Sequence, residues 1–219
     1  MAFSYLTGTT AGSSDANSVT TSSINSSGAT LIIVGVAING NSPTAPTDNQ
    51  GNTYTQAVTV SSGIARSAIY YCVNPTTNSS HTFSYSQFNT TPTLFVNVFD
   101  GGTSTVDVTN SSNNTVSTTI QPGSVTPTSD GQLFITVLSN FVAIADTYSI
   151  NSSFTITQRR EVANPNAQDG AIAYKIQTTG GAENPTWSHS NTTTNGACIA
   201  TFKLNGSTSV NSNFLQFFI

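Results

Sequence analysis

Short apolar runs bounded by glycine and polar residues recur along the chain. Residues 31–38 and 133–138 form two such runs and are rich in β-branched side chains, as is typical of strands buried on both faces. Residues 53–60 and 154–157 instead alternate between apolar and polar positions, which predicts strands with one face in water. No window repeats apolar residues at the helical period of about 3.6. The pattern therefore predicts an all-β protein.

A diverged internal repeat organises these segments. Five of them recur in the same order about a hundred residues later: 27–34 with 129–136, 52–55 with 152–155, 68–71 with 171–174, 83–86 with 187–190, and 94–101 with 199–206. Each half offers about five strands, whereas a separate sandwich usually has about seven. We therefore expect one double-sheet, jelly-roll-like β-sandwich in which two diverged halves interlock. Two small β-sandwiches in tandem are the alternative.

The repeat also suggests how the chain is divided. We expect residues 1–206 to form a single domain with a pseudo-repeat of about 27–101 and 129–206. Residues 103–127 contain strand-like segments and favour a further hairpin or crossing strand over a flexible linker.

The end of the sequence, residues 207–219, is a polar spacer followed by an apolar segment. Its candidate protein-interaction residues are Phe214, Leu215, Phe217, Phe218 and Ile219. Such a segment would be an aggregation hazard if it lay in water. Two alternatives remain open: a final strand that packs on its own domain, or an anchor that docks on a neighbouring subunit.

The chain is unusually poor in charge. Only 6% of its 219 residues are charged, with nine acidic and five basic side chains, for a net charge of -4; ordinary domains carry about 25%. Five cations are too few for a phosphate-binding footprint, so no nucleic-acid partner is expected. No apolar run is long enough for a membrane span, and the first residues lack the basic and apolar regions of a signal peptide. We expect neither membrane association nor export.

Candidate chemistry is sparse. Glu161 and Asp169 are the acids near basic residues, and we favour a surface ion-pair cluster over a catalytic pair. His81 and His189 lie in strand-like segments, where a surface or half-buried histidine is the simpler interpretation, and no metal site or cofactor is expected. No catalytic motif is recognisable. The prediction is a protein with no enzymatic activity.

Three further features each have a structural interpretation. The turn at residues 48–52 resembles a calcium loop in composition but supplies one carboxylate, and a tight hairpin turn explains it equally well. Cys72 and Cys198 fall in strands that read as core, which leaves open whether they are bonded. Trp187 and Tyr148 are candidate platforms for a glycan, although Trp187 aligns with Phe83 in the repeat, which favours core packing.

These features together resemble bacteriophage virion proteins of the capsid-decorating, cementing or fibre type. The resemblance rests on the Ser/Thr/Asn-rich strands, the low charge, the apolar C-terminal end, and residues 48–55 and 68–74, which are similar to a β-sandwich module of phage and bacterial surface proteins. It implies assembly on a virus particle as a homo-oligomer, with a major capsid protein or another virion protein as partner and no cofactor. A carbohydrate-binding or adhesion module that takes a host glycan is the second hypothesis, and a glycan-processing enzyme is the third.

Overall fold

The computed structural model describes residues 2–60, 63–141, 145–161 and 168–205, and every regular element within them is a β-strand. The strands of the first half are β1 (Ser4–Gly12), β2 (Ser18–Thr20), β3 (Leu31–Asn39), β4 (Thr47–Asp48), β5 (Thr55–Thr59), β6 (Ala65–Val73), β7 (Phe83–Ser86) and β8 (Thr93–Asp100). Those of the second half are β9 (Ser104–Ile120), β10 (Gln132–Phe141), β11 (Tyr148–Ile150), β12 (Thr155–Arg160), β13 (Gln168–Gln177) and β14 (Trp187–Leu204). The all-β prediction is confirmed.

The two halves build sheets with the same strand order. The first sheet runs β1-β8-β3-β6-β5, and the second runs β9-β14-β10-β13-β12, because β9 and β10 pair with opposite edges of β14. All of these pairs are antiparallel. Each described strand pairs only within its own half. A β-sandwich is therefore present, but the interlocking, jelly-roll-like detail is not confirmed.

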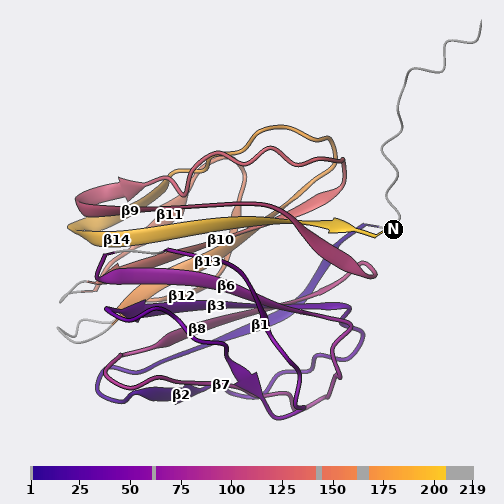
Figure 1. Ribbon diagram of the computed structural model, residues 1–219, viewed down its shortest axis with the longest axis horizontal. Coiled ribbons are helices and arrows are strands. Elements are labelled where there is room, and N and C mark those ends of the chain that lie inside the picture. The colour runs from indigo at the N-terminus through magenta and orange to yellow at the C-terminus, as the bar shows by residue number, and fades with distance from the viewer. Residues whose placement is uncertain (1, 61–62, 142–144, 162–167, 206–219) are drawn as a thin grey trace, which may run out of the picture.

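The two sheets stack face to face and share one apolar core. Figure 1 shows the first half in the lower part of the molecule and the second half above it. Alternate residues of β3, such as Leu31 and Ile33, point into this core from below, and Leu133, Ile135 and Val137 of β10 point into it from above. Phe95, Phe99 and Phe202 fill it further. Burial of this apolar surface is what holds the two halves together.

A second core lies on the outer face of each sheet. The other face of β3 packs against the small sheet β2-β7-β4. Its residues there are Ile32, Val34, Val36 and Ile38, which contact Phe83 and Tyr85. In the second half, Phe134 and Leu138 pack with Ile120 and Trp187. Both faces of β3 and β10 are thus covered, as their unbroken apolar runs predicted.

Two long strands supply the outer layer of the second half. At its start β14 pairs with β11 and with the end of β9, and further on it pairs with β10. The change takes place through register shifts between Ser188 and Asn195, and bulges of this kind let a strand bend from one layer into another. Residues 103–127 thus contain one 17-residue strand that corresponds in position to β1 and β2. The preference for a strand over a flexible linker is confirmed, and of the two forms expected the segment is a single strand and not a hairpin.

The described residues contain no helix with the length and apolar character required to cross a membrane.

Candidate functional site

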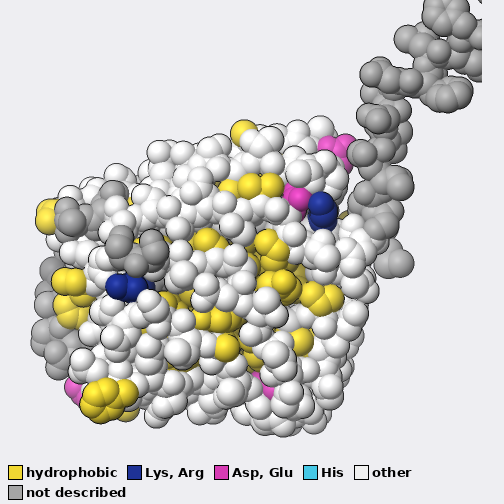
Figure 2. Space-filling model, in the orientation of Figure 1, with side chains coloured by type: hydrophobic (Ala, Val, Ile, Leu, Met, Phe, Trp, Pro, Cys, Tyr) yellow, Lys and Arg dark blue, Asp and Glu magenta, His cyan; other side chains and the backbone are white. Residues whose placement is uncertain are grey.

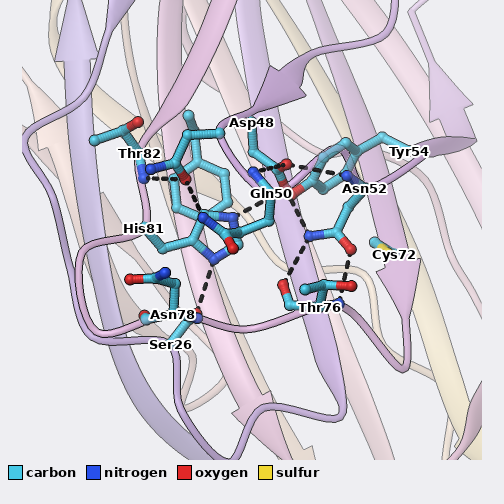
Figure 3. A network of polar contacts seen from close by, with 12 residues as sticks. Ser26, Asp48, Gln50, Asn52, Tyr54, Cys72, Thr76, Asn78, His81 and Thr82 are labelled. Atoms are coloured by element: carbon cyan, nitrogen blue, oxygen red, sulfur yellow. Dashed lines mark hydrogen bonds and ion pairs between the residues drawn. The ribbon is translucent and has the colours of Figure 1, made fainter.

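The first polar network is built around the Asp48 carboxylate, at the end of the short strand β4 (Figure 3). Oδ1 accepts the backbone N–H groups of Gln50 (2.9 Å) and Asn52 (3.0 Å), and Oδ2 accepts the Asn52 amide (2.8 Å) and the Tyr54 hydroxyl (2.7 Å). An aspartate that accepts N–H groups two and four residues later closes a tight turn. Donors within the turn therefore occupy both oxygens of its single carboxylate. The turn resembles a calcium loop in composition because Asp and Asn close this tight turn.

His81 extends the network to a second loop. Its Nε2 lies 2.9 Å from Asp48 Oδ2, and both side chains are fully buried. Its Nδ1 lies 2.8 Å from the Ser26 hydroxyl, which in turn contacts the backbone of Asn78. The imidazole also stacks on Phe83, with ring centroids 4.3 Å apart. One histidine thus joins the segment before β3 to the β4–β5 turn.

Hydroxyl, imidazole and carboxylate here follow the order found in nucleophilic hydrolases. Three observations favour a structural role for this chain of contacts. Ser26, His81 and the Asp48 side chain are all fully buried, the Ser26 oxygen already accepts the N–H of Asn78 at 3.0 Å, and Asp48 is shared among several donors. A substrate would have no path to the hydroxyl. We therefore interpret the group as a buried tie between loops.

The electrostatics of the network match this interpretation. Burial acts to raise the pKa of Asp48, but hydrogen bonds from Tyr54, Asn52 and His81 outweigh it and lower the pKa below its ordinary value. Burial and the neighbouring Asp48 carboxylate raise the pKa of Tyr54 strongly. Asp48 therefore stays ionised as an acceptor while Tyr54 stays protonated as a donor, which suits charge-assisted hydrogen bonds.

A second buried Asp–His pair lies in the other half. His189 Nδ1 is 3.1 Å from Asp146 Oδ2, and both side chains are fully buried. Asp146 also accepts the backbone N–H groups of Thr147 (3.0 Å), Ser190 (2.6 Å) and Asn191 (3.1 Å). Burial opposes ionisation, but hydrogen bonds from Ser190 and Asn140, together with the His189 imidazole, lower the pKa of Asp146.

The two pairs do not occupy equivalent positions. Asp48 is opposite Phe83, and Ile150 is opposite Trp187, the counterpart of Phe83. His189 comes two residues after Trp187, as Tyr85 comes two residues after Phe83, so His189 takes the position of Tyr85. The Tyr85 hydroxyl accepts a backbone hydrogen bond from Thr44, at 3.1 Å. At equivalent positions of the two halves, Tyr85 and His189 thus each fasten a loop to the sheet, with different side chains.

The expectation of surface or half-buried histidines is wrong, because both rings are buried against carboxylates. Residue types alone gave little signal, since Asp48 and His81 are far apart in sequence and meet only after β4 pairs with β7. Among the described residues, no group of three or more His, Cys, Asp or Glu side chains is placed to hold a metal ion.

The two aromatic residues considered as glycan platforms are buried. Trp187 is 0% exposed and donates its indole N–H to Thr136 at 3.0 Å, and Tyr148 is 6% exposed. Neither ring faces solvent, so neither forms a stacking platform for a sugar. Core packing, the favoured interpretation of Trp187, describes its surroundings correctly.

The remaining candidates are placed as follows. Arg159 pairs with Glu161 near the surface (3.5 Å), whereas Arg160 pairs with an Asp169 side chain that is 0% exposed (3.6 Å). The expectation of a surface ion-pair cluster is therefore wrong for the second pair. Cys72 and Cys198 are buried and free. The apolar segment at residues 214–219 lies outside the described residues.

One end of the molecule gathers exposed apolar side chains. We call it the loop end; it is the left end in Figure 1, where β3 and β10 finish and β6 and β13 begin. The Gly40 N–H donates to the carbonyl of Ile64, and the Asn41 amide donates to the carbonyl of Phe88. Ile64 is 53% exposed and Phe88 84%; Val116, near the bend of β9, is 72% exposed.

The surface around these side chains is polar but carries few charges. Figure 2 shows mostly uncharged atoms, with isolated apolar patches and very few basic or acidic side chains. Arg159, Arg160, Lys175 and Lys203 are each paired with a carboxylate. Pairing leaves little long-range field to attract or repel a partner.

Fold and networks together define a β-sandwich protein whose halves share a strand order and in which buried Asp–His pairs fasten loops to the sheets. Comparison of the chain with protein families, with curated proteins and with solved structures found no match.

Proposed function

We propose that this chain is a non-enzymatic structural protein of a virus particle, of the phage capsid-decorating, cementing or fibre type. It acts through protein–protein contacts. The observation that carries the proposal is the group of exposed apolar side chains at the loop end, Ile64, Phe88 and Val116, on a nearly uncharged surface.

Such a surface has the composition of a contact site. Interface cores are depleted in charged residues and enriched in aromatic ones, and the surrounding rim is polar. Phe88 is the most exposed of the large apolar side chains described, and burying it against a partner would gain roughly 1.5–3 kcal/mol. Loops held by a rigid β-scaffold commonly carry binding. Of the two buried Asp–His pairs, Asp146–His189 lies near this end, because Asn140, close to where β10 finishes, donates to Asp146.

The proposed partners are a second copy of this chain and a virion protein such as the major capsid protein. The proposed location is the virion. The sequence resemblance to phage proteins supports this choice of partner, and the contact surface supports the mode of action.

Sedimentation velocity of the full chain tests the contact surface. We expect concentration-dependent association that weakens at least about tenfold in the double variant Ile64→Ser/Phe88→Ser. The control is Leu6→Ser on β1, an exposed apolar residue (42%) away from the loop end. Association that is equal in all three proteins would contradict the role of this surface.

The virion assignment needs a separate measurement. Quantitative immunoblotting of purified particles should detect the wild-type chain in the particle fraction and show less of the double variant. A chain found only in the soluble fraction would refute the virion assignment, whatever its oligomeric state.

A further inference from the structure

A polar hollow of about 250 Å³ opens at the loop end, and none of Ile64, Phe88 and Val116 lines it. Asp15 and Asn17, between β1 and β2, form one wall. Asn39 at the end of β3 and Asn89 before β8 form another. Phe141, at the end of β10, comes from the other half of the molecule. Both halves therefore contribute to the hollow.

Two amide groups of the hollow are held in defined orientations. Asn17 Oδ1 accepts the N–H of Thr90 (3.3 Å), and Asn39 Oδ1 accepts the N–H of Thr91 (3.0 Å). Each amide is thereby fixed through its oxygen against the β7–β8 loop. Neither Nδ2 group donates a hydrogen bond to another described residue. The amide nitrogens of Asn17 and Asn39 are therefore available as donors on the wall of the hollow.

Asp15 supplies the complementary acceptor. Its backbone N–H bonds to Ser13, but its carboxylate accepts no hydrogen bond from another described residue. It is the charged residue among those that line the hollow. Arg160 contacts Ser14, beside Asp15, at 3.0 Å, and its charge is matched by Asp169 at 3.6 Å. No cation is among the described residues that line the hollow, so the Asp15 carboxylate would repel an anionic ligand.

This combination of groups matches a neutral polyhydroxylated ligand. A sugar hydroxyl both donates and accepts, so adjacent hydroxyls can bond the Asp15 carboxylate and the Asn amides at the same time. Phe141 lines the hollow as well and offers apolar surface for the C–H groups of the sugar ring. The hollow is smaller than the roughly 300–1,000 Å³ of drug-sized sites, which fits one sugar ring or the end of a longer chain.

We infer that this hollow is a binding site for a neutral glycan, with Asn17 and Asn39 as donors and Asp15 as acceptor. The inference goes beyond the proposed structural function and uses none of the apolar side chains on which that function rests. It also replaces Trp187 and Tyr148, which are buried, with residues that line an open hollow.

The test is saturation-transfer NMR on the full chain with glucose, galactose, mannose and N-acetylglucosamine, and with N-acetylneuraminic acid as the acidic comparison. We expect at least one neutral sugar to bind with millimolar affinity. The Asn17→Asp/Asn39→Asp variant keeps both backbone-bonded oxygens but removes both donors, and should weaken binding at least about tenfold. Asn25→Asp is the matched control, because Asn25 Oδ1 also accepts a backbone N–H, that of Ser27, outside the hollow.

Asp15→Ala keeps the test decisive if the double variant melts at a lower temperature, because no fold contact of the carboxylate is lost. It too should weaken binding. The inference is overturned if none of the neutral sugars binds, if the acidic sugar binds more tightly, or if binding is the same in wild type, Asp15→Ala and the double variant.

Discussion

Replacing Asp48 with alanine should cost the protein about 3–5 kcal/mol of unfolding free energy, because two buried polar side chains lose their acceptor. The figure follows from the partners left behind. His81 is 0% exposed and Tyr54 is 5% exposed, and a buried polar group without a partner costs about 1–3 kcal/mol. The backbone donors of Gln50 and Asn52 lie nearer the surface and regain water, so they add less.

Urea unfolding followed by far-UV circular dichroism and by Trp187 fluorescence measures this loss. Thermal unfolding gives a second measure. For a chain of this size a loss of about 1 kcal/mol lowers the melting temperature by about 2–4 °C, so the melting temperature of the variant should fall by about 10 °C. Trp187 lies in the second half and Asp48 in the first. A shift in both signals therefore also shows that the shared core couples the halves.

Asp130→Ala is the control, because Asp130 is exposed and accepts a backbone hydrogen bond from Gly180. It should cost less than about 1 kcal/mol. If Asp48→Ala costs no more than Asp130→Ala, the network is not a stabilising tie and the reasoning fails.

The same network predicts how stability depends on pH. The folded-state pKa of Asp48 lies below its ordinary value of 3.8, so its contribution is fully present above that value. It is lost as the pH falls through the lower, folded-state pKa. The stability difference between wild type and Asp48→Asn should therefore be largest near neutral pH and shrink in acid. A difference that grows on acidification would contradict the sign.

Three further predictions concern the cores and the second network. Gly35→Val should destabilise the fold by about 1–3 kcal/mol, because a Cβ there would lie 2.8 Å from Val137 across the shared core; an unchanged urea midpoint would show that the sheets can separate. Burial raises the pKa of Cys198 to about 12 and also raises that of Cys72, so a thiol reagent such as DTNB should react with the two cysteines only after denaturation, and rapid reaction of the native protein would refute this. Asp146→Ala should cost about as much as Asp48→Ala, within about 1 kcal/mol, and a much smaller loss in the same urea assay would show that the two pairs are not comparable.

Local pattern predicted the strands well but not their partners. The run at residues 31–38 is apolar at every position except Gly35, and this reflects a strand covered on both faces. The pattern does not say which sheet covers it, because strand pairing is a long-range choice that many alternating segments satisfy equally. The jelly-roll-like expectation came from counting strands per half, which missed the short ones, β2, β4 and β11.

The composition of residues 104–120 also gave no signal that they form one long strand. Residues 109–119 are mainly Asn, Ser and Thr, which normally indicate turns, yet they continue β9 without a break. The buried Asp–His pairs were missed for a related reason. The role of a histidine depends on what its neighbours in space are, and those neighbours are set by pairings such as β4 with β7.

The common strand order has a consequence for how such a protein can change. Since β3 and β10 both finish at the loop end, the two halves display connecting loops at the same end of the molecule. Each set of loops can accumulate insertions and substitutions independently, while the paired sheets beneath stay constant. A lineage that must keep pace with a changing partner gains from this arrangement, because twice the number of variable segments meet the partner without new demands on the core.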